Sequence, residues 1–233
     1  EVVIVDDGSV DKPRAATISD PRIVWLEQPP LGIVSALELG RLHRKHEFIA
    51  RLDADDVALP GRIQNQLAVM RADPRIGVVG GRADLVNDAG MVGEGMQKYV
   101  DWVNGLADLH AELLVESPLF HPAALMRASA VASVGGYRDG DLPEDYDLWL
   151  RLDRAGFRLV ATEKTVVQIR DHDARLTRTD ARYRREAFDS IKHEWLRSGP
   201  LKARRRVIVW GAGRTGKRWI RRFLEDGHDV CAV

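Results

Sequence analysis

The chain has 233 residues, 45% of them hydrophobic, and its 35 Lys and Arg balance its 35 Asp and Glu. This composition predicts a globular protein and gives no reason to expect a nucleic acid as partner. The single Cys231 excludes an internal disulfide, and no apolar run reaches the roughly 18 residues of a membrane span, so we expect a cytoplasmic protein.

The first part of the chain predicts alternating strands and helices. The apolar run Val2 to Val5 indicates a buried strand. A second strand at residues 23–26, a helix at 33–45 and a strand at 48–52 follow. This βαβ order is typical of a parallel sheet.

The middle of the chain continues the same pattern, apart from residues 82–118, where we predict no regular element. A helix opens at Pro60, and a strand follows at residues 76–79. The later predicted elements are a strand at 123–126, a short helix from Ser129, a helix from Glu144 and a strand at 158–161.

A break after the helical residues 180–197 predicts a domain boundary. Ser198-Gly199-Pro200 and a basic run precede a new strand at 207–210. We expect a first domain at 1–197, a linker at 198–206 and the beginning of a Rossmann-like domain at 207–233.

Asp53, Asp55 and Asp56 directly follow the strand predicted at residues 48–52. A strand points alternate side chains to the same face, so Asp53 and Asp55 should converge where the strand ends, whereas Asp56 should point to the other face. Magnesium-type ions are held by one or two carboxylates together with water and phosphate oxygens. The pattern therefore predicts a site for a metal-bound nucleotide diphosphate. The alternative is an acidic loop in which Asp56 caps a helix.

Two further acidic pairs occupy positions where ligands are often bound. Asp6 and Asp7 end the first strand, where open α/β sheets place ligands, although Asp-Asp-Gly-Ser is also a good turn. Glu144 and Asp145 open a predicted helix. Acids are favoured there by the helix dipole alone, but one could also act as a general base.

Three ordered segments resemble glycosyltransferase family 2: Val5-Asp6-Asp7-Gly8-Ser9, Arg51-Leu52-Asp53-Ala54-Asp55-Asp56 and Glu144-Asp145-Tyr146-Asp147-Leu148-Trp149. The resemblance covers about residues 1–180. Pro60, Arg62 and Gln66, then His121, Pro122 and Arg127, are similar to lesser features of the family. It implies a GT-A fold, an α/β mixed and mostly parallel sheet flanked by helices.

The resemblance also implies an activity and a set of roles. The activity is hexosyl transfer from a nucleotide diphosphate sugar to a hydroxyl acceptor, with Mg²⁺ or Mn²⁺ and with inversion. The acceptor would be a glycan or a lipid-linked glycan, the latter at the inner face of the membrane. The implied roles are base and ribose contacts for Asp6 and Asp7, a ribose-side contact for Asp53, metal binding for Asp55, general base for Asp145, and Glu144 beside it.

Departures from the family pattern bear on the reaction. The Gln-x-x-Arg-Trp segment of processive synthases is missing, which favours transfer of one sugar at a time. The family's first strand and helix are missing before Glu1, so we expect an incomplete nucleotide pocket. Arg170, His172 and Arg175 either meet the donor diphosphate or lie in a solvated loop, and Trp149 is expected in the core.

Gly211, Gly213 and Gly216 lie between a predicted strand and a predicted helix, as in a dinucleotide or phosphate loop. The acid expected about 20 residues later would fall at or past the last residue. Arg218 stands where a phosphate loop needs Ser or Thr, which disfavours an NTPase. An NAD-type dinucleotide is thus a possible but unsupported cofactor. Two alternatives remain: a fragment of an NAD-dependent oxidoreductase, and an inactive nucleotide-sugar-binding module.

Overall fold

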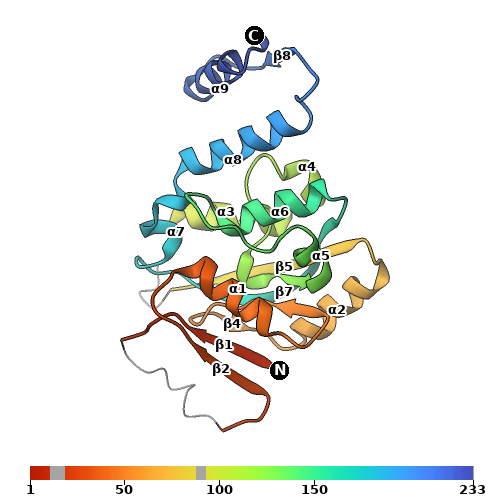
Figure 1. The fold of residues 1–233 in the computed structure, drawn as a ribbon, viewed down its shortest axis with the longest axis vertical. Helices are drawn as coiled ribbons and strands as arrows, with labels where there is room; N and C mark the ends of the chain where they lie inside the picture. Colours follow the sequence, from red (N-terminus) through yellow and green to blue (C-terminus); the bar gives the residue numbers. More distant parts are fainter. Residues whose placement is uncertain (11–18, 88–92, 233) are drawn as a thin grey trace. The chain divides into compact units, whose positions relative to one another are not determined.

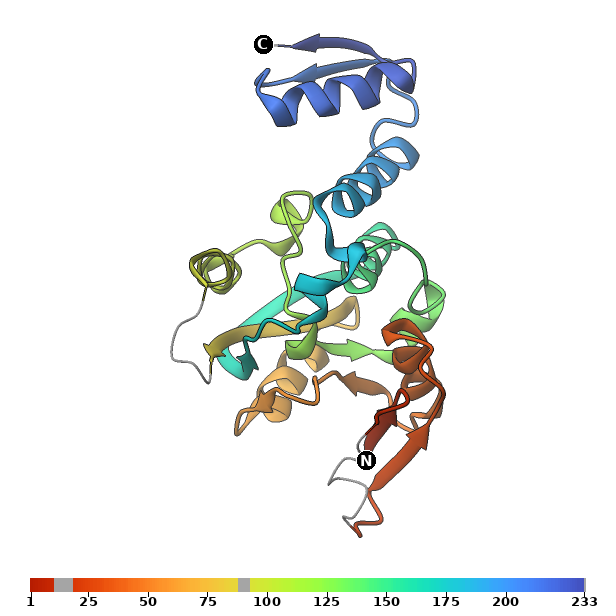
Figure 2. The same cartoon turned by 90° about the vertical axis from the view of Figure 1, so that its left-hand side faces the viewer.

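The structure, a computed structural model, describes residues 1–10, 19–87 and 93–232. The chain forms two compact units, residues 1–182 and 183–233 (Figures 1 and 2). Within the described residues, no helix combines the length and the apolar character needed to cross a membrane.

The first unit contains all the strands and helices expected in residues 1–161, but the strands expected at 76–79 and 158–161 are much longer and extend to Val86 and Arg170. Residues 82–118, for which no regular pattern was expected, contribute the end of one strand and two helices. The elements are β1 (Val2–Asp6), β2 (Ile23–Glu27), α1 (Ile33–His43), β3 (Phe48–Ala50), β4 (Val57–Ala58), α2 (Arg62–Ala72), β5 (Ile76–Val86), α3 (Glu94–Gly105), α4 (Leu109–Glu112), η2 (His121–Ala123), β6 (Leu125–Arg127), α5 (Ala128–Ser133), α6 (Glu144–Arg154), β7 (Arg158–Arg170), α7 (Leu176–Thr179) and η3 (Ala181–Tyr183).

The main sheet has five strands in the order β3-β6-β5-β7-β4. The long strands β5 and β7 are parallel, whereas the β3–β6, β5–β6 and β4–β7 pairs are antiparallel. The mixed sheet is confirmed, but it is more antiparallel than expected. Each antiparallel pair includes at least one of the short strands β3, β4 and β6, which have two or three residues each. β1 and β2 form a separate parallel pair.

Helices cover both faces of the main sheet, which explains why residues 76–81 of β5 are continuously buried. On one face, Met70 of α2 packs with Ile76, Val79 and Leu125. In another buried cluster, two valines of α3 pack with residues of β5, β7 and η2 (Figure 1). The site residues described below follow the ends of these packed strands.

A buried polar contact fixes the segment that follows β3. The Arg62 guanidinium on α2 donates to the carbonyl oxygen of Arg51 at 2.6 Å and, through Nε, to Gln66 Oε1 at 3.2 Å. The Gln66 amide donates to the carbonyl oxygens of Val79 at 2.8 Å and Ala123 at 2.7 Å. Because such buried groups are costly to leave unpaired, α2 holds the start of the acidic segment firmly.

The second unit is a strand–helix–strand arrangement preceded by a helix. Its elements are α8 (Arg185–Ser198), β8 (Arg206–Val209), α9 (Arg214–Glu225) and β9 (Asp229–Ala232). β8 and β9 are parallel, so the expected βαβ part is present; Val233 lies outside the described residues. His193 of α8 contacts Asp226, the residue that follows α9, at 2.6 Å, and α8 belongs to this compact unit. The domain boundary at 198–206 stays a prediction.

Candidate functional site

The three aspartates after β3 form a tight group. One carboxylate oxygen from each of Asp53, Asp55 and Asp56 lies within 4.8 Å of the others. β3 ends at Ala50, and the chain turns at residues 54–55. The expectation that alternation along the strand separates Asp56 from the other two was therefore wrong, because a turn brings all three together.

Asp56 is also not a helix cap. The N-cap position of α2 is Gly61, and no side chain caps that helix. Asp56 is instead buried: its Oδ1 accepts the backbone N–H of Arg170 at 2.9 Å, and its Oδ2 is buried without a hydrogen-bond partner among the described residues. Burial, with Asp53 and Asp55 nearby, raises the pKa of Asp56 to about 6. A cation would satisfy such an oxygen.

The end of β7 and the residues after it adjoin the same group. His172 Nε2 lies 2.8 Å from Asp55 Oδ2, and Arg170 Nε donates to the backbone oxygen of Asp55 at 3.3 Å. Imidazole nitrogens and carboxylates both bind divalent metals. Arg170, His172 and Arg175 were expected either at the donor diphosphate or in a solvated loop. Arg170 and His172 lie at the acidic group. Arg175 lies 3.9 Å from Asp171.

Arg51 connects the acidic group to the helix α6. Its guanidinium forms an ion pair with Asp53, and its side chain is only 10% exposed. Its positive charge also acts on Asp145, whose pKa it lowers against larger opposing effects, and it interacts electrostatically with Glu144. The acidic segment after β3 and the start of α6 are thus brought together around the guanidinium of Arg51.

Glu144 and Asp145 are the first residues of α6, but they are not solvated first-turn acids. Glu144 is 2% exposed, and Asp145 is half-buried with its Oδ1 accepting the N–H of Tyr146 at 2.7 Å. Burial and the neighbouring Glu144 raise the pKa of Asp145 to about 7. A carboxylate that titrates near neutral pH is suited to general base catalysis.

Asp6 and Asp7 organise the loop that follows β1. The N–H of Ser9 donates to Asp6 Oδ1 at 2.8 Å, which is the turn contact considered above. Asp7 accepts the N–H groups of Leu31 and Gly32, each at 2.9 Å. Burial opposes ionisation of Asp7, but these bonds and one from Gln28 outweigh it and lower the pKa. Nucleotide contacts by Asp6 and Asp7 stay a prediction.

The structure adds site residues to which the sequence gave no role. Asp147 is buried and forms ion pairs with Arg138 and with Arg151, the latter at 2.7 Å, which anchors the first turn of α6. Tyr137 contacts His121 at 2.7 Å. Spacing within the helix could have suggested Asp147 and Arg151 as an i,i+4 pair. Trp149 is fully buried, which confirms its place in the core.

The glycine loop of the second unit has the expected strand–loop–helix geometry. Gly211 has a φ of +95°, which favours glycine, and a Cβ on Gly216 would collide with the carbonyl oxygen of Gly211. Gly213 is the N-cap residue of α9. Dinucleotide or phosphate binding at Gly211, Gly213 and Gly216 stays a prediction.

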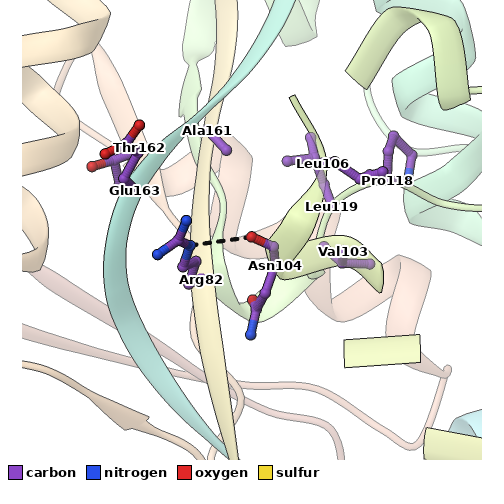
Figure 3. Close-up of a pocket in the computed structure, with 10 residues that line it drawn as sticks. Arg82, Val103, Asn104, Leu106, Pro118, Leu119, Ala161, Thr162 and Glu163 are labelled. Atoms are coloured by element: carbon purple, nitrogen blue, oxygen red, sulfur yellow. Dashed lines mark hydrogen bonds between the residues drawn. The ribbon is translucent and has the colours of Figure 1, made fainter. Parts of the chain in front are cut away.

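A pocket beside β5 is lined mainly by residues of β5, α3 and β7 (Figure 3). Arg82 Nε donates to the backbone oxygen of Asn104 at 3.1 Å at its edge. None of the carboxylates discussed above lines it. The pocket is therefore separate from the candidate site.

The chain matches the model of the family described as Glycosyl transferase family 2 over residues 1–135. It is 29% identical over 175 residues to the amylovoran biosynthesis glycosyltransferase AmsE of Erwinia amylovora, covering 73% of this chain and 64% of that protein. An uncharacterized glycosyltransferase of Haemophilus influenzae is 26% identical over 201 residues, which cover 84% of this chain and 71% of the relative. The chain thus spans just under two thirds of AmsE.

Solved structures show the same fold. The mannosyltransferase PcManGT of Pyrobaculum calidifontis, solved with GDP-Man and Mn²⁺, superposes with a TM-score of 0.54 at 20% identity, covering 72% of this chain and 47% of that one. Residues 1–349 of TarS of S. aureus, solved with UDP-GlcNAc, give a TM-score of 0.59 at 14% identity, covering 97% and 72%. Both are nucleotide-sugar complexes, and the shared fold confirms the expected GT-A architecture.

Proposed function

Because the chain belongs to glycosyltransferase family 2, we propose that it moves one hexose at a time from a nucleotide diphosphate sugar to a hydroxyl group, with inversion at the anomeric carbon. The observation that carries the proposal is the convergence of the acidic group at Asp53, Asp55 and Asp56 with Asp145 around Arg51. The acidic group would hold the donor, and Asp145 would activate the acceptor hydroxyl.

The residues at the acidic group fit a divalent metal. Asp55 and His172 present an oxygen and a nitrogen 2.8 Å apart, and Asp56 has a buried oxygen without a partner among the described residues. We assign Asp55 as the main metal ligand, with His172 and Asp56 beside it. A bound Mg²⁺ or Mn²⁺ would offset the negative charge that grows on the leaving diphosphate.

The chain's own residues supply the rest of the reaction. Asp6, Asp7 and Asp53 would contact the base and ribose of the donor. Asp145 would take the proton of the attacking hydroxyl as that oxygen approaches the anomeric carbon from the side opposite the leaving group. A single displacement of this kind inverts the centre, which matches one base and no covalent intermediate.

The substrate classes are proposed from the relatives. The complexes of the structural neighbours with GDP-Man and UDP-GlcNAc support a nucleotide sugar as donor. The name of AmsE supports a role in polysaccharide or glycoconjugate synthesis. The proposed acceptor is a glycan or a lipid-linked glycan, the latter at the inner face of the membrane.

Release of nucleoside diphosphate tests the proposed function. The protein is incubated with UDP-GlcNAc or GDP-mannose and Mn²⁺, with short oligosaccharides as acceptors, and UDP or GDP is quantified. We expect release from one donor, loss of release with EDTA, and products one sugar longer than the acceptor.

Two outcomes would favour the alternatives. Binding of NAD without binding of either donor would contradict sugar transfer and favour an oxidoreductase. Donor binding without turnover over the whole acceptor panel would favour a nucleotide-sugar-binding module. Products extended by many sugars would contradict transfer of one sugar at a time.

A further inference from the structure

The basic residues of the chain are concentrated in the second unit. Residues 183–233 hold 13 Lys and Arg against 6 Asp and Glu, whereas residues 1–182 hold 22 against 29. The chain as a whole is neutral. The two compact units therefore carry net charges of opposite sign, and the positive charge belongs to the unit that lies outside the family match over residues 1–135.

The helix α9 carries a basic stripe, which we define as Arg214, Lys217, Arg221 and the leucine at its end, Leu224. These positions are three or four residues apart, so they lie along one side of the helix. All four side chains are exposed. Phe223, on the opposite side of the helix, is buried, and α9 packs against β8 and β9 (Figure 2). The basic stripe is therefore directed away from the core of the second unit.

The positive charges of the basic stripe are not neutralised within the unit, in contrast to those of the neighbouring arginines. Arg218 Nε lies 2.7 Å from Asp189 Oδ2, and the Arg222 guanidinium lies 6.0 Å from the centre of the Trp219 ring. The three basic residues of the stripe form no ion pair with any residue that the structure describes. Their charge can therefore attract an anionic partner.

A basic run before β8 adds to this positive charge. Lys202, Arg204 and Arg205 are exposed. Because α9 connects the parallel strands β8 and β9, it runs back from the end of β8 towards its beginning. The backbone N–H of Asp229, which opens β9, donates to the carbonyl oxygen of Arg205 at 2.6 Å. The basic run thus lies at the end of the unit where the basic stripe finishes.

The chemistry of the basic stripe fits an extended anionic surface that has an apolar layer beneath it. Several cations spread along a helix and a loop attract an array of anions more strongly than one small anion. Leu224 is 56% exposed beside these cations. An exposed apolar side chain among basic residues suits the boundary between lipid headgroups and acyl chains, whereas binding to the phosphates of a nucleic acid does not use one.

We propose that the basic stripe, together with the basic run at residues 202–205, binds membranes that contain anionic lipids. The inference extends the proposed function, in which a lipid-linked acceptor lies at the membrane, because docking would concentrate the enzyme beside that acceptor. Each basic residue close to an anionic lipid surface strengthens binding about fivefold. Several weak contacts therefore add up to reversible attachment.

Sedimentation with vesicles measures this binding for the full chain. One set of vesicles contains phosphatidylcholine alone, and the other contains equal parts of phosphatidylcholine and the anionic phosphatidylglycerol. We expect the protein to sediment with the mixed vesicles and to stay in solution with phosphatidylcholine alone. Raising the salt concentration to about 1 M, where the Debye length is about 3 Å, should release the protein.

Replacement of Arg214, Lys217 and Arg221 by alanine is expected to lower the partition coefficient for the mixed vesicles on the order of 10²-fold. Alanine is the best helix former, so α9 should remain folded, which circular dichroism checks. A second variant, with Arg214→Lys, Lys217→Arg and Arg221→Lys, keeps the three charges. It should bind the mixed vesicles as the wild type does.

The matched control removes three exposed basic residues of the first unit, Lys45→Ala, Arg71→Ala and Lys164→Ala. It changes the net charge by the same amount and should keep the partition coefficient within about twofold, because the attraction falls off within a Debye length. Equal losses in the two alanine variants, or equally tight binding to phosphatidylcholine alone, would overturn the inference. Tighter binding to duplex RNA than to the mixed vesicles, at equal phosphate concentration, would overturn it in favour of a nucleic acid.

The outcome is separate from that of the proposed sugar transfer. Sedimentation needs neither a donor nor an acceptor, so a protein that binds the mixed vesicles but releases no nucleoside diphosphate would contradict only the proposed function. A protein that transfers sugar to soluble oligosaccharides but does not bind the mixed vesicles would contradict only the membrane docking.

Discussion

Asp145→Asn is expected to lower turnover by about 10²- to 10⁴-fold while donor affinity stays close to that of the wild type. The amide has nearly the same shape as the carboxylate but cannot accept the proton of the attacking hydroxyl. Asp145 lies at the start of α6, and Arg51 lies between it and the acidic group. Replacement of Asp145 should therefore leave the donor contacts intact.

The pH dependence of the wild type follows from the same residue. Burial and Glu144 raise the pKa of Asp145 to about 7. A base is active when it is deprotonated, so kcat should be highest above that pKa and fall as the pH decreases through about 7. In Asp145→Asn the residual rate should lose this acid limb.

Comparison of kcat with the donor dissociation constant checks the prediction, with Asp153→Asn as control. Asp153 lies on the same helix and contacts His110 at 2.5 Å, away from the reacting groups. Its replacement is expected to change kcat by no more than about twofold, since the His110 side chain is largely exposed. Equal losses of donor affinity and turnover in Asp145→Asn would assign Asp145 to donor binding.

Asp55→Ala is expected to weaken donor binding on the order of 10²-fold and to remove its dependence on Mn²⁺. Asp55 is the most exposed of the three clustered aspartates and contacts His172, so it presents a ligand oxygen toward solvent. Loss of a direct charged contact costs about 2–3 kcal/mol. Turnover should fall as well, because the same ion would offset charge on the leaving group.

Titration of donor into protein with Mn²⁺ and with EDTA measures both effects. Asp101→Ala provides a control: Asp101 is an exposed aspartate on α3 that accepts a bond from Gln97. The control should bind donor as the wild type does. If Asp55→Ala retained Mn²⁺-dependent donor binding, the metal would have to be held elsewhere.

The three acidic segments could be recognised from the sequence because their residue types and order are specific. The local conformation of each segment could not be predicted from the sequence. Strand periodicity assumed that the strand beginning at Phe48 extended to Leu52, whereas it ends at Ala50. The turn that follows brings Asp56 into the group and buries it, which strand alternation does not predict.

Long-range contacts account for the rest of what the sequence did not predict. His172 contacts Asp55 because the end of β7 lies beside the acidic group. Tyr137 contacts His121 because the loop before α6 lies beside η2. Such contacts depend on tertiary packing, not on spacing along one element. α3 was also not predicted, although it has a buried face formed by Val100 and Val103.

The most direct test of the proposed site is the position of Mn²⁺ in crystals grown with the ion and a nucleoside diphosphate. Anomalous scattering locates manganese independently of the protein model. We predict a peak between the carboxylate of Asp55, His172 and the diphosphate, with the ribose at Asp53. A nucleotide bound at this site without manganese, or manganese bound away from Asp55, would contradict the proposed metal-dependent sugar transfer.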